Sequence, residues 1–216
     1  MKRRVSMFLG LVLAVAGFSL GVAAQDLKLI KLPPPQTSGG RPLMQVLNER
    51  KSTREFGAGT LSPQTLSNLL WAAFGINRPD GRRTAPSAMN WQEVDIYVAT
   101  PEGIYLYDAK ANTLNPAVSG DHRVATGTQS FVKDAAVNLV YVADFSRIAA
   151  QANPDAEMYA AADVGFIAQN VYLYCASEGL ATVVRASIDK PALAKTLSLR
   201  PNQKIILAQS VGYPKK

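Results

Sequence analysis

The stretch that decides the fold of this chain reads Arg50-Lys51-Ser52-Thr53-Arg54-Glu55-Phe56. It places three cations and two hydroxyls within five residues, just after a predicted helix over residues 42–49. Guanidinium groups bind phosphate oxygens bidentately, lysine adds a point charge, and serine adds a short hydrogen bond. The stretch therefore predicts a site for a phosphate monoester. A plainer interpretation stays open, because cations also favour the negative end of a preceding helix.

A second stretch follows downstream and reads Ala85-Pro86-Ser87-Ala88-Met89-Asn90-Trp91-Gln92. It carries short polar side chains on a loop that proline bends. Amide and hydroxyl groups placed in this way are able to read the edge of a flat heteroaromatic ring. A phosphate clamp followed by a ring-reading loop predicts a mononucleotide cofactor.

Both stretches, in this order and spacing, resemble the FMN-dependent nitroreductase family. In that family an Arg-x-Ser-x-Arg/Lys element holds the FMN phosphate, and a Pro-Ser-x-x-Asn-x-Gln loop meets the flavin. Residues 163–173, followed by Glu178-Gly179-Leu180, resemble the family's long central helix, and residues 211–214 resemble its last strand end. The resemblance covers residues 42–216. Within the family, residues 83–88 and 103–108 look most like the azoline-oxidising dehydrogenases that form thiazoles and oxazoles.

The resemblance implies two sets of cofactor contacts, which lie in the two quoted stretches. The first set holds the FMN phosphate and consists of Arg50, Lys51, Ser52 and Arg54. The second set contacts the flavin and consists of Pro86, Ser87, Ala88, Asn90 and Gln92. Either C-terminal lysine, Lys215 or Lys216, is a further candidate for the phosphate.

The resemblance also implies that Ala186 and Ser187, after a predicted strand over residues 181–184, present backbone N–H groups to the reactive flavin edge. Family members often carry Glu-Gly or Gly-Gly at that point, so this chain departs from the pattern. Arg185 beside them favours, as a hypothesis, an anionic reduced flavin or an acidic substrate.

Residues 1–24 read as a targeting segment. A basic start is followed by an apolar run over residues 7–20 and by the small residues Val22-Ala23-Ala24. This pattern predicts a secretory signal cleaved near Ala24, because the apolar run is shorter than the ~20 residues a membrane span needs and glycines interrupt it. We therefore expect an exported protein, periplasmic or extracellular, without a stable membrane anchor after cleavage.

Charge and cysteine content narrow the class of partner. Removing the segment subtracts three positive charges, so the formal net charge falls from +7 to +4. The cations are spread along the chain and are not interleaved with aromatic residues, which argues against a nucleic-acid partner. The sequence has a single cysteine, so no disulfide can form within the chain.

The remaining chain reads as a proline- and glycine-rich arm over residues 25–41 and one domain over residues 42–216. Ser62-Pro63 predicts the start of a helix that Gly75 ends. The helices are predicted over residues 42–49, 62–74 and 158–177, and the strands over residues 94–100, 104–107, 136–143, 181–184 and 205–211. No Gly-x-Gly-x-x-Gly follows any of these strands, which argues against a dinucleotide-binding domain.

Other chemistry has little support in the sequence. His122 is the sole histidine, so a metal site is not expected. Cys175 falls on the apolar stripe of the long helix and reads as a small buried hydrophobe. Asp163 on the same helix reads as a structural hydrogen-bonding group. No Gly-x-Ser-x-Gly sequence is present, so hydrolase chemistry is not indicated.

These observations predict an α+β, nitroreductase-like sandwich with a central, mostly antiparallel sheet flanked by helices. The resemblance implies a homodimer that binds FMN and works as an oxidoreductase on a small-molecule or peptide substrate. Outside the cytoplasm a nicotinamide donor is not expected, which favours dehydrogenation with oxygen or a quinone as acceptor. One alternative is a flavin- or anion-binding protein of the cell envelope that catalyses nothing. The other is an interaction protein of the envelope that uses the proline-rich arm and has lost the cofactor.

Overall fold

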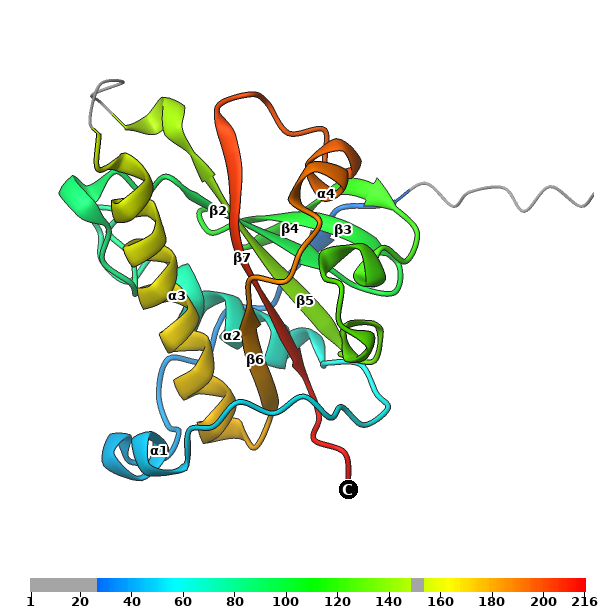
Figure 1. The fold of residues 1–216 in the computed structure, drawn as a ribbon. Helices are drawn as coiled ribbons and strands as arrows, with labels where there is room; N and C mark the ends of the chain where they lie inside the picture. The colour runs from blue at the N-terminus through cyan, green and yellow to red at the C-terminus, as the bar shows by residue number, and fades with distance from the viewer. Residues whose placement is uncertain (1–26, 149–153) are drawn as a thin grey trace, which may run out of the picture.

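The structure, a computed structural model, describes residues 27–148 and 154–216, so the predicted signal segment lies outside it. Its centre is a seven-stranded sheet in the order β1-β4-β3-β2-β5-β7-β6, in which every neighbouring pair runs antiparallel (Figure 1). The strands are β1 Ile30–Lys31, β2 Val94–Ala99, β3 Gly103–Asp108, β4 Thr113–Ser119, β5 Val137–Asp144, β6 Ala181–Arg185 and β7 Gln203–Gly212. The predicted antiparallel sheet is confirmed.

Four α-helices accompany the sheet in the described ranges. They are α1 Leu43–Glu49, α2 Pro63–Phe74, α3 Ala156–Glu178 and α4 Lys190–Thr196. Helix α2 begins as predicted, since the Ser62 hydroxyl accepts the Thr65 N–H and Pro63 occupies the first turn. Helix α3 ends at Gly179, whose left-handed φ of 71° suits a residue without a Cβ. None of these helices is long and apolar enough to cross a membrane.

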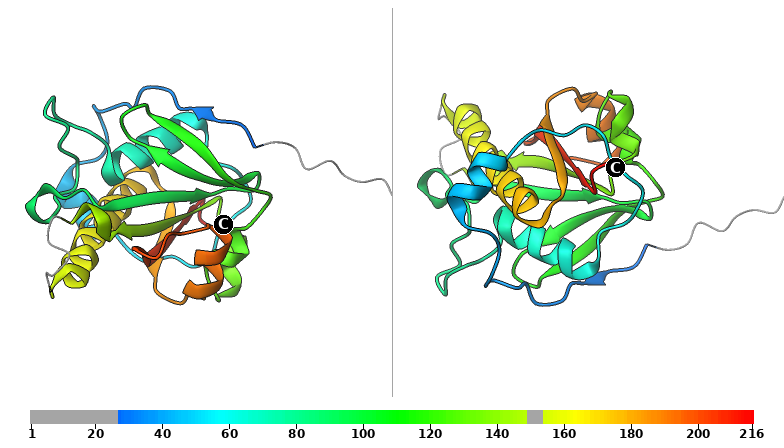
Figure 2. Two further views of the ribbon diagram at one scale, coloured as in Figure 1. Left: turned by 90° about the horizontal axis from the view of Figure 1, so that it is seen from above. Right: turned by 90° about the horizontal axis from the view of Figure 1, so that it is seen from below.

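Helices α2 and α3 cover one face of the sheet, and α4 covers the other (Figures 1 and 2). Alternation along the two central strands produces these layers, because successive side chains of a strand point to opposite faces. Leu139 and Tyr141 of β5 pack toward α2 and α3, while Val140 and Val142 pack toward α4. Burying each such side chain contributes roughly 1.5–3 kcal/mol, so both faces of the sheet stabilise the domain.

The arm before α1 is extended and packs against the domain. Strand β1 pairs with β4, and Leu32 is buried beside them. The Ser67 hydroxyl on α2 donates to the Pro33 carbonyl at 2.6 Å, and the Gln36 N–H donates to Asn68 Oδ1 at 2.8 Å. The proline-rich sequence therefore follows α2 as an ordered strap.

The sequence does not predict three elements of the fold, namely the short strand β1 in the arm, strand β4 and helix α4. Strand β4 contains Pro116, a residue that weakens any strand assignment, yet it pairs with β3 beyond a register shift next to Ile104. Helix α4 has only seven residues, too few for a clear apolar period. Its start is marked by Asp189, whose carboxylate accepts the Ala192 N–H, with a proline in the first turn.

Candidate functional site

The basic stretch after α1 is extended because it is held on both sides. The Thr53 N–H donates to the Thr182 carbonyl on edge strand β6 at 2.9 Å. Further along, Phe56 forms an antiparallel bridge with Pro214, and the Lys215 N–H donates to the Glu55 carbonyl at 3.3 Å. The stretch therefore runs between β6 and the C-terminal segment, which brings Lys215 beside it.

Cations gather around a cavity of about 740 Å³ at the C-terminal end of α3. Lys51, Arg54 and Lys215 line it together with Ser52. Within the described residues, neither these cations nor Arg50 forms an ion pair with a carboxylate. Two carboxylates also line the cavity: Glu49 is already paired with Arg41, and Glu55 alone faces the three cations. The cavity therefore has an excess of positive charge, which suits an anion.

Tyr172 on α3 orients the serine of this cluster. Its hydroxyl accepts the Val184 N–H at 3.0 Å and lies 2.7 Å from Ser52 Oγ. Because the tyrosine oxygen already accepts one bond, its own proton is available to Ser52, whose hydroxyl is then free to donate into the cavity. The Arg50 guanidinium carbon lies 5.2 Å from the centre of the Tyr172 ring. The sequence did not single out Tyr172. The only signal for its role is a hydroxyl on the side of the helix that faces the core.

The second predicted stretch forms a loop with a strained backbone. Met89, Asn90 and Gln92 have φ angles of 48°, 56° and 49°, in the left-handed region that side chains disfavour. Each such residue costs on the order of 1 kcal/mol, so the loop persists only because its surroundings fix it. Inside it the Ser87 hydroxyl accepts the Gln92 N–H at 3.1 Å. We call residues 86–92 the strained loop.

Residues on several elements hold this loop from outside, and among them Arg147 donates to the Gln92 carbonyl at 3.2 Å. Asp163 on α3 accepts the Ala88 N–H at 2.9 Å, which confirms its predicted structural role. The Gln92 side chain accepts from Arg83 Nε at 2.7 Å and donates to the Gly81 carbonyl at 3.2 Å. The Trp91 ring meets the Tyr159 ring edge-on at 5.9 Å. The hydrogen bonds of the Gln92 carboxamide therefore hold the loop in place, whereas Pro86 and Asn90 are exposed.

We call Arg50, Lys51, Ser52 and Arg54 the phosphate cluster. This cluster and the strained loop contact α3 at different positions along the helix axis. Tyr172 contacts the first and Asp163 the second, and nine residues of helix separate them by about 14 Å along the axis. No residue of the strained loop lines the cationic cavity. Ala186 and Ser187 follow the far end of β6, the strand that the basic stretch joins at Thr182. Within one chain, the structure thus places the phosphate cluster next to edge strand β6 and leaves the strained loop separate from both.

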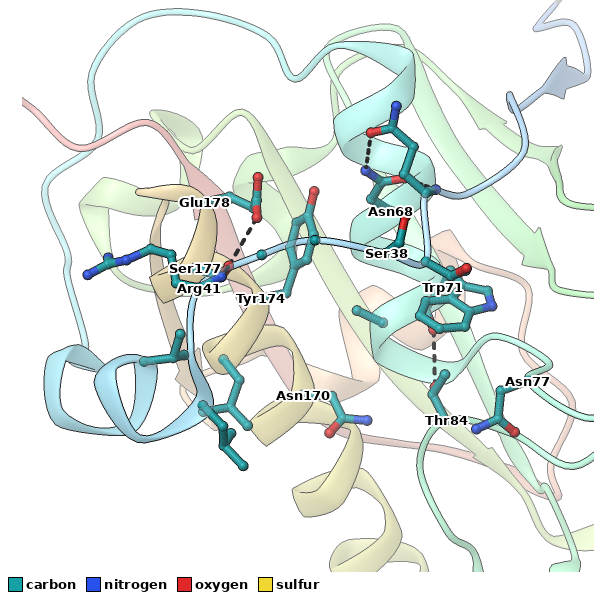
Figure 3. A pocket seen from close by; sticks show the side chains of 18 residues that line it. Ser38, Arg41, Asn68, Trp71, Asn77, Thr84, Asn170, Tyr174, Ser177 and Glu178 are labelled. Atoms are coloured by element: carbon teal, nitrogen blue, oxygen red, sulfur yellow. Dashed lines mark hydrogen bonds between the residues drawn. The ribbon is translucent and has the colours of Figure 1, made fainter.

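A second hollow of about 540 Å³ lies between the arm, α2 and α3 (Figure 3). The rings of Trp71 and Tyr174 line it, and the Asn170 side chain points in from α3 (Figure 3). The Trp71 Nε1–H donates to the Ile76 carbonyl at 3.1 Å, so its ring is fixed at the wall rather than packed in the core. Arg41 lines both hollows, which therefore lie on either side of it.

Arg185 points into the protein. It is 6% exposed, and its guanidinium donates to the Thr126 carbonyl and hydroxyl, to Asn138 Oδ1 and to Ser210 Oγ. Burial lowers the pKa of Arg185 to about 10. A Cβ at Gly127 would lie 2.1 Å from its Nη1, so the glycine makes room for it. These partners do not line the cationic cavity, so the geometry gives no support to the hypothesis that Arg185 acts on a flavin or an acidic substrate, which stays a prediction.

Metal and thiol chemistry receive no support from the described part of the chain. It contains no group of three or more His, Cys, Asp or Glu side chains able to hold a metal ion. Cys175 is fully buried, and burial raises the pKa of its thiol. The predicted role of Cys175 as a small buried hydrophobe is confirmed.

Known proteins provide an independent comparison. Residues 47–213 match the family model described as the nitroreductase family. A provisionally named nitroreductase of Methanocaldococcus jannaschii is 32% identical over 151 residues, which are 65% of this chain and 76% of that protein. The crystal structure of a provisionally named nitroreductase from Ralstonia eutropha JMP134 is 43% identical, with a TM-score of 0.83, over 87% of this chain and 90% of that one.

Two further solved structures share the fold at lower identity. One is the Escherichia coli microcin synthetase McbBCD complex with truncated pro-MccB17 bound, at 18% identity and a TM-score of 0.67 over 95% of this chain and 85% of that one. The other is a Desulfovibrio desulfuricans protein in complex with FMN, at 22% identity and a TM-score of 0.60 over 82% of this chain and 89% of that one.

Proposed function

The chain belongs to the nitroreductase family, and from this membership we propose that it is an FMN-dependent oxidoreductase acting on a small-molecule or peptide substrate outside the cytoplasm. The observation that carries the cofactor is the cationic cavity, where Lys51, Arg54 and Lys215 meet without a carboxylate partner among the described residues. A phosphate monoester matches that charge and the free Ser52 donor. When bound, FMN supplies the two-electron chemistry, and the protein binds and orients it.

The cofactor and branch assignments draw support from the fold neighbours. A protein of this fold binds FMN, and another belongs to a synthetase complex that holds a peptide precursor. In this chain the Arg50–Arg54 cluster would hold the phosphate, and Ala186 and Ser187 would offer backbone groups just beyond the end of β6. Export rests on the targeting pattern of residues 1–24 and favours a dehydrogenase of the azoline-oxidising type, with oxygen or a quinone as electron acceptor.

A homodimer would bring the phosphate cluster and the strained loop, which are separate within one chain, together at one site. Helix α3 turns an apolar face outward, on which Met158 and Phe166 are 55% and 49% exposed. Ala161, Ala162 and Gly165 are exposed between them and would allow close approach of another helix. We propose that a second copy packs on this face, so that the strained loop of one chain and the phosphate cluster of the other contribute to one site.

The experiment that tests this function is a visible absorption spectrum of the protein purified from its native compartment, with sedimentation of the same sample. We expect flavin bands, release of FMN on denaturation, and a mass twice that of the 23.2 kDa chain less its signal. A colourless protein would next be titrated with FMN. Failure of both would contradict the cofactor, whereas bound FMN that no electron acceptor reoxidises would favour the binding protein over the enzyme.

Replacing Tyr172 by phenylalanine tests how the phosphate cluster is oriented. The change removes the hydroxyl that connects Ser52 to the Val184 N–H. One neutral hydrogen bond is worth about 1 kcal/mol, so we expect FMN to bind roughly fivefold more weakly in a fluorescence titration. Adding Ser52→Ala to Tyr172→Phe should then cost little more, because the two groups act as a unit. Fully additive losses would show that Tyr172 does not work through Ser52.

A further inference from the structure

Glu93 is a buried carboxyl group that the proposed function does not use. It follows the strained loop directly and precedes β2, and the residue is 0% exposed. Within the described residues, neither carboxyl oxygen has a hydrogen-bond donor. An ionised carboxylate without a donor is strongly disfavoured in such a place. Burial of this kind therefore favours a carboxyl group that carries a proton.

The charged neighbours of Glu93 come from each element packed around it. Asp163 lies on the part of α3 that packs against β2 and the Ala88–Asn90 turn, and its charge is the first that acts on the Glu93 carboxyl group. Arg147 is the cation nearby, but its guanidinium pairs with Asp95 of β2 at 2.8 Å and lies 3.8 Å from Asp144 of β5. Arg147 is also 39% exposed, so water screens it. The main partner of Glu93 is therefore a second carboxyl group.

We propose that Glu93 and Asp163 share a single proton, and that this carboxylic acid–carboxylate pair holds the strained loop through the bond between Asp163 and the Ala88 N–H. With one proton present, the Glu93 hydroxyl donates to Asp163, and Asp163 stays ionised. An ionised carboxylate accepts the backbone N–H in a charge-assisted bond, which is stronger than a neutral one. With no proton present, two buried negative charges face each other and nothing donates between them.

The pKa values of the pair point in the same direction. Burial is the largest cause that raises the pKa of Glu93, to about 7, and the nearby Asp163 charge raises it further. Burial also raises the pKa of Asp163, while the Ala88 N–H opposes this. Because the folded pKa of Glu93 exceeds the ordinary 4.5, its contribution is complete below pH 4.5 and is lost as the pH rises through about 7.

The strained loop is therefore held in place more firmly at low pH than at high pH. Met89, Asn90 and Gln92 keep left-handed backbone angles only while their anchors last, and Asp163 is the charged anchor that α3 provides. As the shared proton leaves, repulsion between the two carboxylates weakens the hold of Asp163 on Ala88, while Arg83 and Arg147 still bind Gln92. If the proposed function holds, FMN affinity falls over the same pH range, because the loop is then one of the flavin contacts.

The test follows Trp91, which sits in the loop and is one of two tryptophans. In the full chain carrying Trp71→Phe, without added flavin, its emission is recorded from about pH 5.5 to 8.5, the range that brackets the Glu93 pKa. We expect a transition with its midpoint near pH 7. Glu93→Gln should abolish it, because the amide donates to Asp163 at every pH. Glu102→Gln, on the β2–β3 turn and away from the loop, should leave it unchanged.

A second variant keeps the outcome decisive if Glu93→Gln fails to fold. Asp163→Asn places an amide donor opposite Glu93 and should also remove the transition near pH 7. A flat titration of the parent protein, or the same transition in both variants, would overturn the proposal. FMN binding without any loop transition would overturn the shared proton but spare the proposed function. A loop transition in a protein that never binds FMN would support the shared proton and overturn the proposed function.

Discussion

Replacing Arg54 by alanine is expected to weaken FMN binding by roughly 30- to 150-fold while changing riboflavin binding less than about twofold. A hydrogen bond to a charged group is worth roughly 1.5–3 kcal/mol, and a loss near the upper part of that range corresponds to this factor. Arg54 lines the cationic cavity with no carboxylate partner among the described residues, so its guanidinium is free for a ligand. Riboflavin has the same ring but no phosphate, which isolates the phosphate contact.

The measurement is a fluorescence titration of each flavin into the protein freed of cofactor. Arg82→Ala is the matched control, since this arginine side chain is 57% exposed and lies on the turn after α2. Raising the salt concentration should narrow the difference between FMN and riboflavin, because salt screens exposed charges. If Arg54→Ala weakened both flavins equally, the residue would act on the ring or on the fold, and the phosphate assignment would be incorrect.

Local signals in the sequence predicted much of this fold. Ser62, Pro63 and Gly75 define both ends of α2 through capping chemistry that operates within one turn. Gly179 ends α3 for a comparable reason. The β2–β3 hairpin follows from alternating residues around a short turn. In each case the deciding interaction connects residues that are close in the chain.

The parts that escaped prediction depend on contacts between distant residues. Tyr172 matters because the fold places it against Ser52, which is 120 positions earlier. Glu93 matters because α3 brings Asp163 to it, and nothing in the sequence near residue 93 signals a second carboxyl group. Strand β4 is fixed by its pairing with β3 and β1, although Pro116 argues against it locally. Such features become visible only in three dimensions.

The direction of Arg185 was predictable, although the sequence interpretation missed it. Ala181, Val183 and Arg185 alternate along β6, so their side chains share one face of the strand. Ala181 and Val183 pack with Phe56 and Ala135 in a small core cluster, and Arg185 is buried on the same side. Position beside the predicted flavin edge suggested a cofactor role, whereas strand periodicity already indicated a buried one.

Replacing Arg185 by methionine should therefore affect stability and leave flavin binding nearly unchanged. Removing the buried charge recovers roughly 3 kcal/mol of desolvation, judged from the lowering of its pKa to about 10. The change also loses four hydrogen bonds from a charged donor, worth roughly 1.5–3 kcal/mol each, and leaves the Thr126 carbonyl without its partner. Even at the lower end of that range, the four lost bonds outweigh the recovered desolvation, and we expect a net destabilisation of at least about 3 kcal/mol.

For a domain of this length that change lowers Tm by at least about 6 °C, which calorimetry or circular dichroism measures directly. Arg82→Met is the matched control, and as a substitution of an exposed side chain it should stay within about 0.5 kcal/mol. FMN affinity, titrated well below either Tm, should change less than about twofold, because the Arg185 guanidinium points away from the cavity. A shifted flavin reduction potential with an unchanged Tm would instead place the charge of Arg185 at the cofactor.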